Sequence, residues 1–371
     1  MKDVIVIGGG LAGLINAILL ARAGLSVLLI EKKRYPQHRV CGEYISNEVR
    51  PFLERNGLFP TELAPANITQ FQLTSIRGKS ATLNLDLGAF AVSRYELDYF
   101  LYQKAVEAGV ECYLNTSVAE VQFQGDHFIV EARNREPLTA KIVIGAFGKR
   151  SNLDKKMDRT FAQKKSPYVG VKYHIKTDFP AHTVALHNFE NGYCGINKIE
   201  GTSYNLCYLS HRKNLKKHGN VKRMEAAVLH ENPYLKELFC NSDFVLERPK
   251  VINEISFAKK QAVEQHILMS GDAAGMITPL CGNGMAMAIH SAKLLSDTIL
   301  AHWQAGNFHR SKLEQAYTQK WNKLFATRLW TGRQIQALFG SRWISEVAVG
   351  LVHHVQPLAN FLMKQTHGKT F

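Results

Sequence analysis

Three glycines near the start of the chain have the spacing of a phosphate-binding turn. Gly8, Gly10 and Gly13 form a GxGxxG pattern between an apolar run, Val4–Ile7, and a helix-like run that reaches about Ala23. The first glycine permits a tight turn, the second lets the backbone approach a diphosphate, and the third lets helix and strand pack closely. Free N–H groups at a helix start attract anions. The pattern therefore predicts a dinucleotide site.

An acidic residue completes this pattern. Glu31 ends a second strand-like run, Ser26–Ile30, and lies 23 positions after Gly8. A carboxylate at this place accepts hydrogen bonds from the hydroxyls of an adenosine ribose. Both strands, the helix and the acid together favour dinucleotide binding over an ordinary glycine turn. They do not distinguish FAD from NAD.

A second glycine-rich segment lies far along the chain. The apolar run His266–Met269 leads into Ser270 and GDAAG, where Asp272 can bond a ribityl hydroxyl. A long helix-like run follows the residues Gly282, Asn283, Gly284 and Met285. Their backbone N–H groups could approach a flavin ring and stabilise its reduced form. A loop before a well-capped helix is the simpler explanation, but the two glycine segments together favour FAD.

The elements that must position these residues point to a composite fold. Arg94 to Glu107 reads as an amphipathic helix, and residues 68–92 and 167–210 alternate with the period of antiparallel strands. We therefore expect an α/β (α+β composite) fold with a Rossmann-like FAD-binding domain, an interleaved antiparallel β-sheet domain for substrate, and C-terminal helices. The expected ranges are 1–67, 94–166 and 250–305 for the first, 68–93 and 167–249 for the second, and 306–371 for the last.

Charge and cysteine usage limit the partners. The chain has 46 Lys and Arg against 31 Asp and Glu, a formal net charge of +15, and six scattered cysteines without metal-ligand spacing. We expect a cytoplasmic protein with reduced thiols and no metal. A solvated basic face is the simplest reading of the charge. The alternatives are attraction to an acidic carrier or electron-donor protein, or to the inner face of a membrane as a peripheral protein. No nucleic-acid-binding pattern is present, so no nucleic acid is expected.

The motifs resemble those of a known family. VIGGGLAGL with Glu31, the Cys41-Gly42-Glu43 turn, Arg94, IVIGAFGKRS and GDAAGMITPLCGNGMAMAI are similar to segments of the geranylgeranyl reductase and p-hydroxybenzoate hydroxylase-like FAD-dependent oxidoreductases. Flavin-dependent halogenases are more distant relatives. The resemblance spans about residues 1–305.

The resemblance implies a set of FAD-binding residues, with NADPH or NADH only as a transient reductant. It implies diphosphate contacts near the first turn, adenosine ribose contacts after the second strand, a contact of Arg94 with the FAD phosphates and a backbone contact of Val118 with adenine. The remaining positions would contact the ribityl chain or the ring. The implied residues are, in chain order, Gly8, Gly10, Ala12, Gly13, Glu31, Lys32, Arg39, Cys41, Arg94, Val118, Gly271, Asp272, Gly282, Asn283, Gly284 and Met285.

The chain departs from the family in three places. Phe147 precedes Gly148 where the family usually has Asp, a residue that also helps hydroxylases to bind a nicotinamide cofactor. The halogenase motif GWxWxIP is absent, because residues 192–196 read GYCGI, and this argues against halogenation. The tryptophan of the geranylgeranyl reductase pattern YxWxFP is also missing, which leaves the prenyl substrate open.

Several side chains have two readings. Cys41 either donates a proton to substrate or is a small buried hydrophobe, and Glu43 either binds substrate or caps the helix that follows it. The C-terminal Trp321, Trp330 and Trp343 either pack in the core or face a substrate channel or membrane.

Three functions follow from this sequence. The first is an FAD-dependent reductase that transfers hydride from reduced flavin N5 to a C=C bond of a hydrophobic isoprenoid, polyketide-derived or lipid-like small molecule. The second is a monooxygenase that hydroxylates an aromatic or lipid-like substrate through a C4a-hydroperoxide. The third is a non-catalytic flavin-binding sensor.

Overall fold

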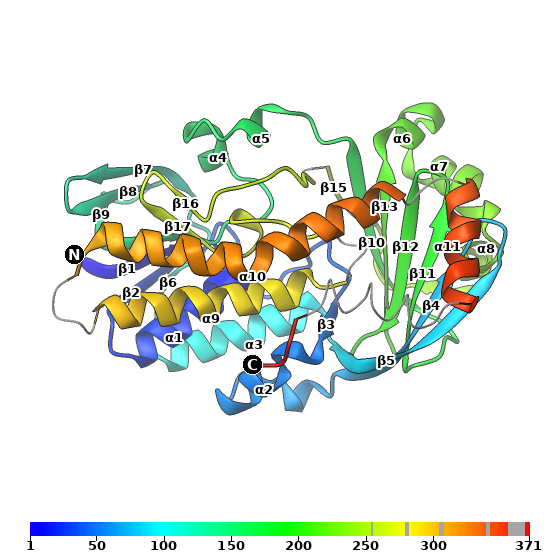
Figure 1. The fold of residues 1–371 in the computed structure, drawn as a ribbon, viewed down its shortest axis with the longest axis horizontal. Coiled ribbons are helices and arrows are strands. Elements are labelled where there is room, and N and C mark those ends of the chain that lie inside the picture. The colour runs from blue at the N-terminus through cyan, green and yellow to red at the C-terminus, as the bar shows by residue number, and fades with distance from the viewer. Residues whose placement is uncertain (254, 279–281, 304–307, 339–341, 355–367) are drawn as a thin grey trace.

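The strands of this protein form two sheets that lie side by side (Figure 1). The computed structural model describes residues 1–253, 255–278, 282–303, 308–338, 342–354 and 368–371. The first sheet has the order β16-β17-β9-β1-β2-β6, and the β7–β8 hairpin extends from β9. Its strands are β1 Lys2–Ile7, β2 Val27–Ile30, β6 Glu111–Tyr113, β7 Val118–Gln124, β8 His127–Ala132, β9 Leu138–Gly145, β16 Val263–Glu264 and β17 Ile267–Met269.

The centre of the first sheet is parallel and buried on both faces. β1 pairs in parallel with β2 and β9, and β17 pairs in parallel with β9. Val4, Ile5 and Val6 of β1 have no exposed surface, as expected for a central parallel strand covered on both sides. Helices α1 Leu11–Arg22, α3 Arg94–Glu107, α9 Gly284–Trp303 and α10 Arg310–Leu338 pack on one another beside this sheet (Figure 1).

The second sheet has the order β14-β10-β13-β12-β11-β4-β5-β3, and β15 pairs with β10. Its pairs are antiparallel except for β4 and β11, which run parallel. Its strands are β3 Tyr44–Ser46, β4 Ala66–Thr74, β5 Ser80–Ala91, β10 Tyr168–Lys176, β11 Thr183–Phe189, β12 Gly192–Lys198, β13 Tyr204–His211, β14 Asp243–Phe244 and β15 Lys250–Ile252.

Alternation along the strands gives the second sheet two different faces. On β10, Val171, Tyr173 and Ile175 pack with side chains of α7 and α8 in one apolar cluster. Lys172 and His174 lie on the opposite face, toward the first sheet. The remaining helices are the short α2 Arg50–Arg55, α4 Asn152–Lys156 and α5 Thr160–Gln163, and α6 Arg212–His218, α7 Val221–Val228, α8 Pro233–Asn241 and α11 Arg342–His354 beside the second sheet.

The structure confirms the expected fold class and refines it. The helix expected over Arg94–Glu107 has those bounds, because Ser93 caps it by accepting a hydrogen bond from Glu96 N at 3.2 Å. The second sheet was expected to be antiparallel, but it contains one parallel pair. The strands β3 and β15 were expected among the cofactor-binding segments and hydrogen-bond to the second sheet instead. In the C-terminal region expected to be helical, 306–371, the structure describes the last helix, α11, as Arg342–His354.

Within the described parts of the chain, no helix has the length and apolar character needed to cross a membrane.

Candidate functional site

A cavity of about 1500 Å³ is lined by residues of both sheets. Most of the residues expected to bind the cofactor line it, although they lie up to 277 positions apart in the sequence. These lining residues are Gly8, Gly10, Ala12, Glu31, Lys32, Arg39, Cys41, Arg94, Val118, Gly271, Asp272, Gly282, Gly284 and Met285. Gly13 and Asn283 are buried and do not line the cavity.

The first glycine turn has no room for a side chain at Gly8 or Gly13. Gly8 has a φ of +105°, and a Cβ there would lie 2.5 Å from the carbonyl oxygen of Ala146. A Cβ on Gly13 would lie 1.8 Å from the carbonyl oxygen of Gly8. No side chain caps α1, whose N-cap residue is Gly10. The free N–H groups of this helix start therefore face the cavity, where they suit a diphosphate.

The second glycine turn meets the first. Gly271 has a φ of +64°, and a Cβ there would lie 2.9 Å from Cβ of Ala12. Behind this contact, Asn16 Nδ2 donates to the Ala12 carbonyl at 2.7 Å and lies 3.0 Å from Ser270 Oγ. Ser296 Oγ donates to Asn16 Oδ1 at 2.9 Å. The sequence reading missed this buried network, although an asparagine within an apolar helix was a signal for it.

Two cations and two carboxylates lie beside the first turn. Glu31 accepts hydrogen bonds from Gly9 N at 2.7 Å and Lys33 N at 3.1 Å. Arg39 lies 2.9 Å from the buried Asp98 and 3.4 Å from Glu31. Asp98 also binds Arg94 at 2.7 Å. Burial lowers the pKa of Arg94, but Asp98 outweighs burial and holds that pKa above its ordinary value. Arg94 therefore stays charged at the cavity wall.

A second helix start also faces the cavity. Gly282 has a φ of +62°, and a Cβ there would lie 3.2 Å from the ring of Tyr44. Helix α9 begins two residues later at Gly284. Asn283 Nδ2 donates to the buried Glu48 at 3.3 Å, which fixes the entry into the helix. Backbone N–H groups at such a start suit the polar edge of a flavin ring. Residues 279–281, part of the same motif, lie outside the described residues.

Two basic side chains hold the second glycine turn from behind. Lys260 Nζ donates to the carbonyls of Asp272 at 2.7 Å and Lys149 at 2.9 Å. Arg159 Nη2 donates to the carbonyl of Ala273 at 3.0 Å. Burial lowers the pKa of Lys260 to about 8 despite the nearby carboxylates. The sequence reading missed both residues, because they bond backbone rather than a recognisable motif.

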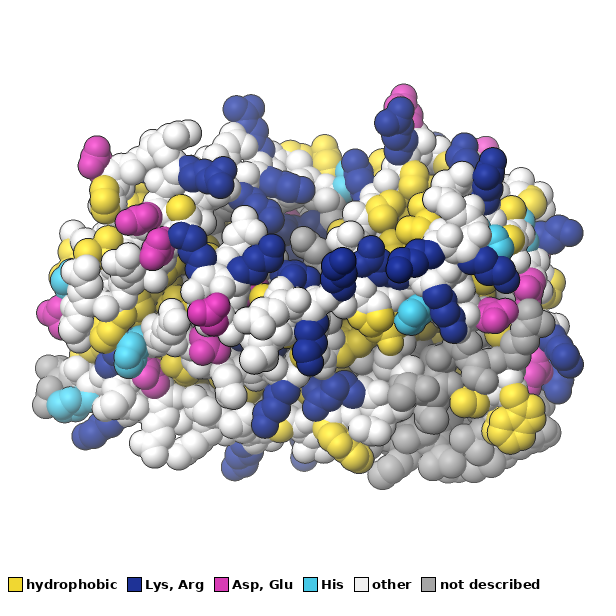
Figure 2. Space-filling model, turned by 90° about the horizontal axis from the view of Figure 1, so that it is seen from above, with side chains coloured by type: hydrophobic (Ala, Val, Ile, Leu, Met, Phe, Trp, Pro, Cys, Tyr) yellow, Lys and Arg dark blue, Asp and Glu magenta, His cyan; other side chains and the backbone are white. Residues whose placement is uncertain are grey.

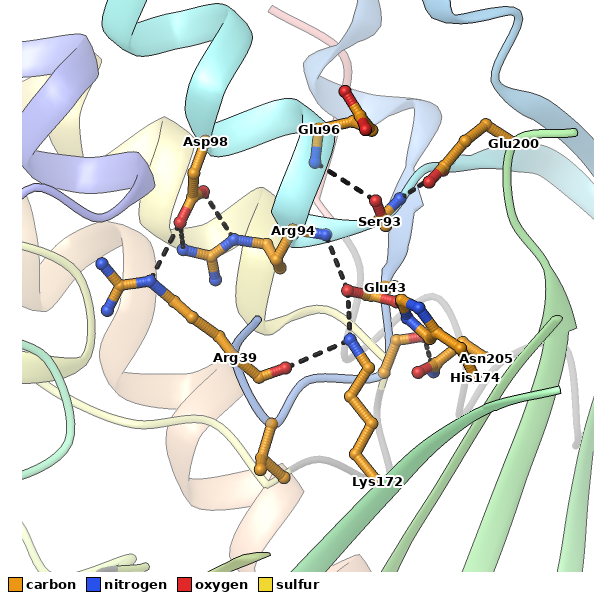
Figure 3. A network of polar contacts seen from close by, with 12 residues as sticks. Arg39, Glu43, Ser93, Arg94, Glu96, Asp98, Lys172, His174, Glu200 and Asn205 are labelled. Atoms are coloured by element: carbon orange, nitrogen blue, oxygen red, sulfur yellow. Dashed lines mark hydrogen bonds and ion pairs between the residues drawn. The ribbon is translucent and has the colours of Figure 1, made fainter. Parts of the chain in front are cut away.

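Glu43 caps a different helix from the one expected. Its carboxylate accepts a hydrogen bond at 2.6 Å from Arg94 N, at the start of α3, rather than from the helix that follows it in sequence (Figure 3). The Lys172 ammonium and His174 Nε2, at 2.8 Å, bind the same carboxylate. The expected cap is therefore corrected to α3, which lies about fifty residues downstream.

Cys41 lies two residues before Glu43 and lines the cavity. Its side chain is half-buried and lies against the guanidinium of Arg94. This position is open to a ligand, so a proton-donating role remains a prediction.

The far part of the cavity is apolar. The second sheet and α11 supply most of its apolar side chains, and Ile255 comes from the segment after β15. The apolar lining residues include Phe71, Leu73, Leu83, Leu85, Leu186, Tyr193, Leu209, Ile255, Ile344 and Val347. Trp343 also lines the cavity and is 76% exposed, Trp321 is in the core at 3%, and Trp330 is 58% exposed. Trp321 therefore packs in the core, Trp343 lines the cavity, and Trp330 is exposed.

Basic side chains surround this cavity. Figure 2 shows a band of Lys and Arg across the middle of one face. Several basic residues that line the cavity form no ion pair with any carboxylate in the described part of the chain, namely Lys149, Arg150, Lys155, Lys165, Arg212 and Lys250. Unpaired cations around a cavity raise the local concentration of anionic ligands or partners.

Comparisons with known proteins agree with this geometry. The family model described as "FAD binding domain" matches residues 1–327. The digeranylgeranylglycerophospholipid reductase of Methanosarcina acetivorans is 24% identical over 86% of this chain and 80% of its own length. The flavin-dependent halogenase armH3 of Armillaria mellea is 26% identical over 85% of this chain and 72% of its own. A triple mutant of the flavin-dependent brominase Bmp2 has the same fold, with a TM-score of 0.79, 20% identity, and coverage of 99% and 96% of the two chains.

Proposed function

Because this chain belongs to the FAD binding domain family and is an FAD-dependent oxidoreductase, we propose that it reduces a carbon–carbon double bond of a hydrophobic, isoprenoid, polyketide-derived or lipid-like substrate. Bound reduced FAD supplies a hydride. The protein's own residues place the double bond, exclude water and provide the proton that completes the reduction. NADPH or NADH serves as the transient reductant of the flavin.

The observation that carries this proposal is the apolar chamber that continues from the glycine turns. Leu186, Tyr193 and Leu209 lie along one face of the second sheet, and Ile344 and Val347 of α11 line the chamber too. Such a wall holds a long apolar chain by hydrophobic contact, with few groups that could orient a small polar substrate. The similarity to the digeranylgeranylglycerophospholipid reductase supports the same class of substrate.

Cys41 is the proposed proton donor. The hydride adds to one carbon of the double bond and leaves an electron pair on the other, and the Cys41 thiol gives its proton to that carbon. Solvent then reprotonates the thiolate. Because general acids contribute about 100-fold or more, Cys41→Ala is expected to slow substrate reduction by about 100-fold. The rate of flavin reduction by NADPH in that variant should stay at the wild-type value.

The test uses the full chain with FAD bound. The protein is reduced without oxygen and mixed with geranylgeraniol, while the flavin absorbance and the product mass are followed. Reoxidation of the flavin together with a product that has gained two hydrogens is the expected result. An unchanged alcohol and a flavin that stays reduced across a panel of isoprenoid and fatty alkenes would overturn the proposal.

Oxygen-dependent chemistry is the second candidate. The similarities to armH3 and to the Bmp2 brominase favour it, since both names describe flavin-dependent halogenation. The aerobic reaction with NADPH, run with and without bromide, distinguishes the cases by product mass. A gain of one oxygen indicates hydroxylation, a gain of bromine indicates halogenation, and either result without alkene reduction replaces the first proposal.

The partner proposed for the basic surface is an acidic carrier or electron-donor protein. Arg212, Lys165 and Lys250 support this partner, because they line the cavity without carboxylate partners in the described residues. A flavodoxin, used as an acidic probe, should bind with an affinity that falls as salt rises, and Arg212→Glu should weaken it further. Binding to anionic phosphatidylglycerol vesicles but not to flavodoxin would instead indicate a peripheral membrane protein.

A further inference from the structure

The loop between β2 and β3 carries a carboxylate with no exposed surface. Glu43 is 0% exposed and has a φ of +51°, which is unusual for a residue other than glycine. Three donors reach its side chain: Arg94 N at 2.6 Å, the Lys172 ammonium, and His174 Nε2 at 2.8 Å (Figure 3). This carboxylate therefore joins the start of α3 to strand β10 of the second sheet.

The backbone of the same loop is held at several points. Lys172 Nζ donates to the carbonyl of Arg39 at 3.2 Å, and Asn205 Nδ2 donates to the carbonyl of Gly42 at 2.8 Å. Asn197 Nδ2 donates to the carbonyl of Glu43 at 3.4 Å. Three strands of the second sheet, β10, β12 and β13, thus supply side chains to three of the five residues 39–43, namely Arg39, Gly42 and Glu43.

Stability alone does not account for such a cluster. Removing a carboxylate and an ammonium from water is costly, and well-packed apolar residues in place of a buried ion pair often stabilise a protein as much or more. Burial raises the pKa of Glu43, but Lys172 and His174 outweigh burial and hold that pKa below its ordinary value. Glu43 therefore stays charged. A buried ion pair of this kind is weak evidence for net stability, so fixed geometry of the loop is the alternative reason for it.

The residues that the loop carries explain why fixed geometry matters. Arg39 and Cys41 both line the cavity, and Arg39 reaches Asp98 and Glu31 beside the first glycine turn. A displacement of the loop would move both side chains relative to the bound cofactor. We infer that Glu43 is a positioning residue of the FAD site, which acts through Lys172 and His174 to hold the loop 39–43, and with it Arg39 and Cys41, against the cavity.

The test compares two buried carboxylates on opposite faces of the second sheet. Glu43→Gln keeps the size of the side chain and an acceptor for Arg94 N, but removes the charge. Glu225→Gln is the matched control, because Glu225 is buried beneath the other face and bonds Tyr173 at 2.9 Å and Tyr208 at 2.8 Å. Glu43→Gln is expected to weaken FAD binding about 10-fold, which corresponds to about 1.4 kcal/mol. It should also shift the visible absorption spectrum and reduction potential of the bound flavin. Glu225→Gln should leave all three at wild-type values.

A second pair of variants tests whether Glu43 acts through its partner. Lys172→Met alone should weaken FAD binding, and the combination with Glu43→Gln should weaken it by less than the product of the two effects, since both changes break one interaction. If Glu43→Gln does not fold, His174→Gln carries the same comparison, because it removes a single contact. Wild-type affinity, spectrum and potential in the folded variants would overturn the inference. That outcome is independent of whether the protein reduces alkenes, since the inference rests on the FAD site alone.

Discussion

The two walls of the cavity are built by different means. On the side of the first sheet, backbone groups form the wall, because two glycine turns and two helix starts present N–H groups to the cavity. On the side of the second sheet, side chains form the wall, with an apolar stretch near Leu209 and a polar cluster around Glu43. The backbone wall suits the cofactor, which is common to all members of the FAD binding domain family. The side-chain wall can change its substrate without changing the fold.

The largest expected effect tests the backbone wall. Gly13→Ala would place a methyl group 1.8 Å from the Gly8 carbonyl oxygen. We expect a loss on the order of 3 kcal/mol in the free energy of unfolding, measured by urea denaturation, and loss of FAD binding. Gly24→Ala is the comparison for backbone strain alone, because Gly24 has a φ of +88° with nothing within 4 Å of the added atom, whereas Gly13 lies within helix α1 and meets the Gly8 carbonyl. A loss at Gly13→Ala no larger than the loss at Gly24→Ala would mean that close packing does not set the need for glycine at position 13.

A smaller effect concerns a side chain of the second sheet. His187 is fully buried on β11, bonds Thr74 Oγ1 at 2.9 Å, and has a pKa lowered by burial to about 3 from 6.5. The unfolded chain takes up a proton at this residue at a higher pH than the folded chain does. Its contribution to stability is therefore full above about pH 6.5 and falls as the pH drops toward 3.

The measurement for His187 is a denaturation series against pH. Between about pH 7 and pH 5 the wild type should lose about 2 kcal/mol more than His187→Gln. Parallel curves for the two proteins would show that folding does not lower the pKa of His187.

Glu31 combines the two means of building the site, because its side chain accepts hydrogen bonds from backbone N–H groups. Glu31→Gln keeps an acceptor but loses the charge that holds Gly9 N and Arg39. FAD binding is expected to weaken about 10-fold, since a hydrogen bond to a charged group contributes about 1.5–3 kcal/mol. Quenching of flavin fluorescence on titration gives this affinity. An unchanged affinity for FAD would contradict the expected contact between the Glu31 carboxylate and the ribose.

The smallest effect is expected at the open end of the chamber. Trp343 lines the cavity but is 76% exposed, so Trp343→Ser should change the free energy of unfolding by no more than about 0.5 kcal/mol. It should raise the KM for an apolar substrate a few-fold and leave kcat unchanged. A large loss of stability in thermal denaturation would show that α11 supports the core rather than the substrate.

The difference between the backbone wall and the side-chain wall also explains which parts of the site could be predicted from the sequence. Gly8, Gly10 and Gly13 were readable because a turn restricts residues that lie next to one another. Helix α3 was predicted from the amphipathic run Arg94–Glu107, which is local in the same way, and the Ser93 cap lies next to that run.

The partners of Glu43 were not readable. Lys172 and His174 follow it by 129 and 131 positions, and nothing in the local sequence of β10 marks them as its partners. Lys260 and Arg159 escaped notice because they donate to carbonyl groups, which every residue has.

The contact between Ala12 and Gly271 has a consequence for biosynthesis. β1 leaves the ribosome well before β9 and β17 of the same sheet, whose residues begin at positions 138 and 267. Pairing over such sequence distances is slow, because a long loop must close first. Cofactor loading therefore has to wait for the synthesis of β17, and nascent chains that stop before β17 should emerge without flavin and depend on chaperones.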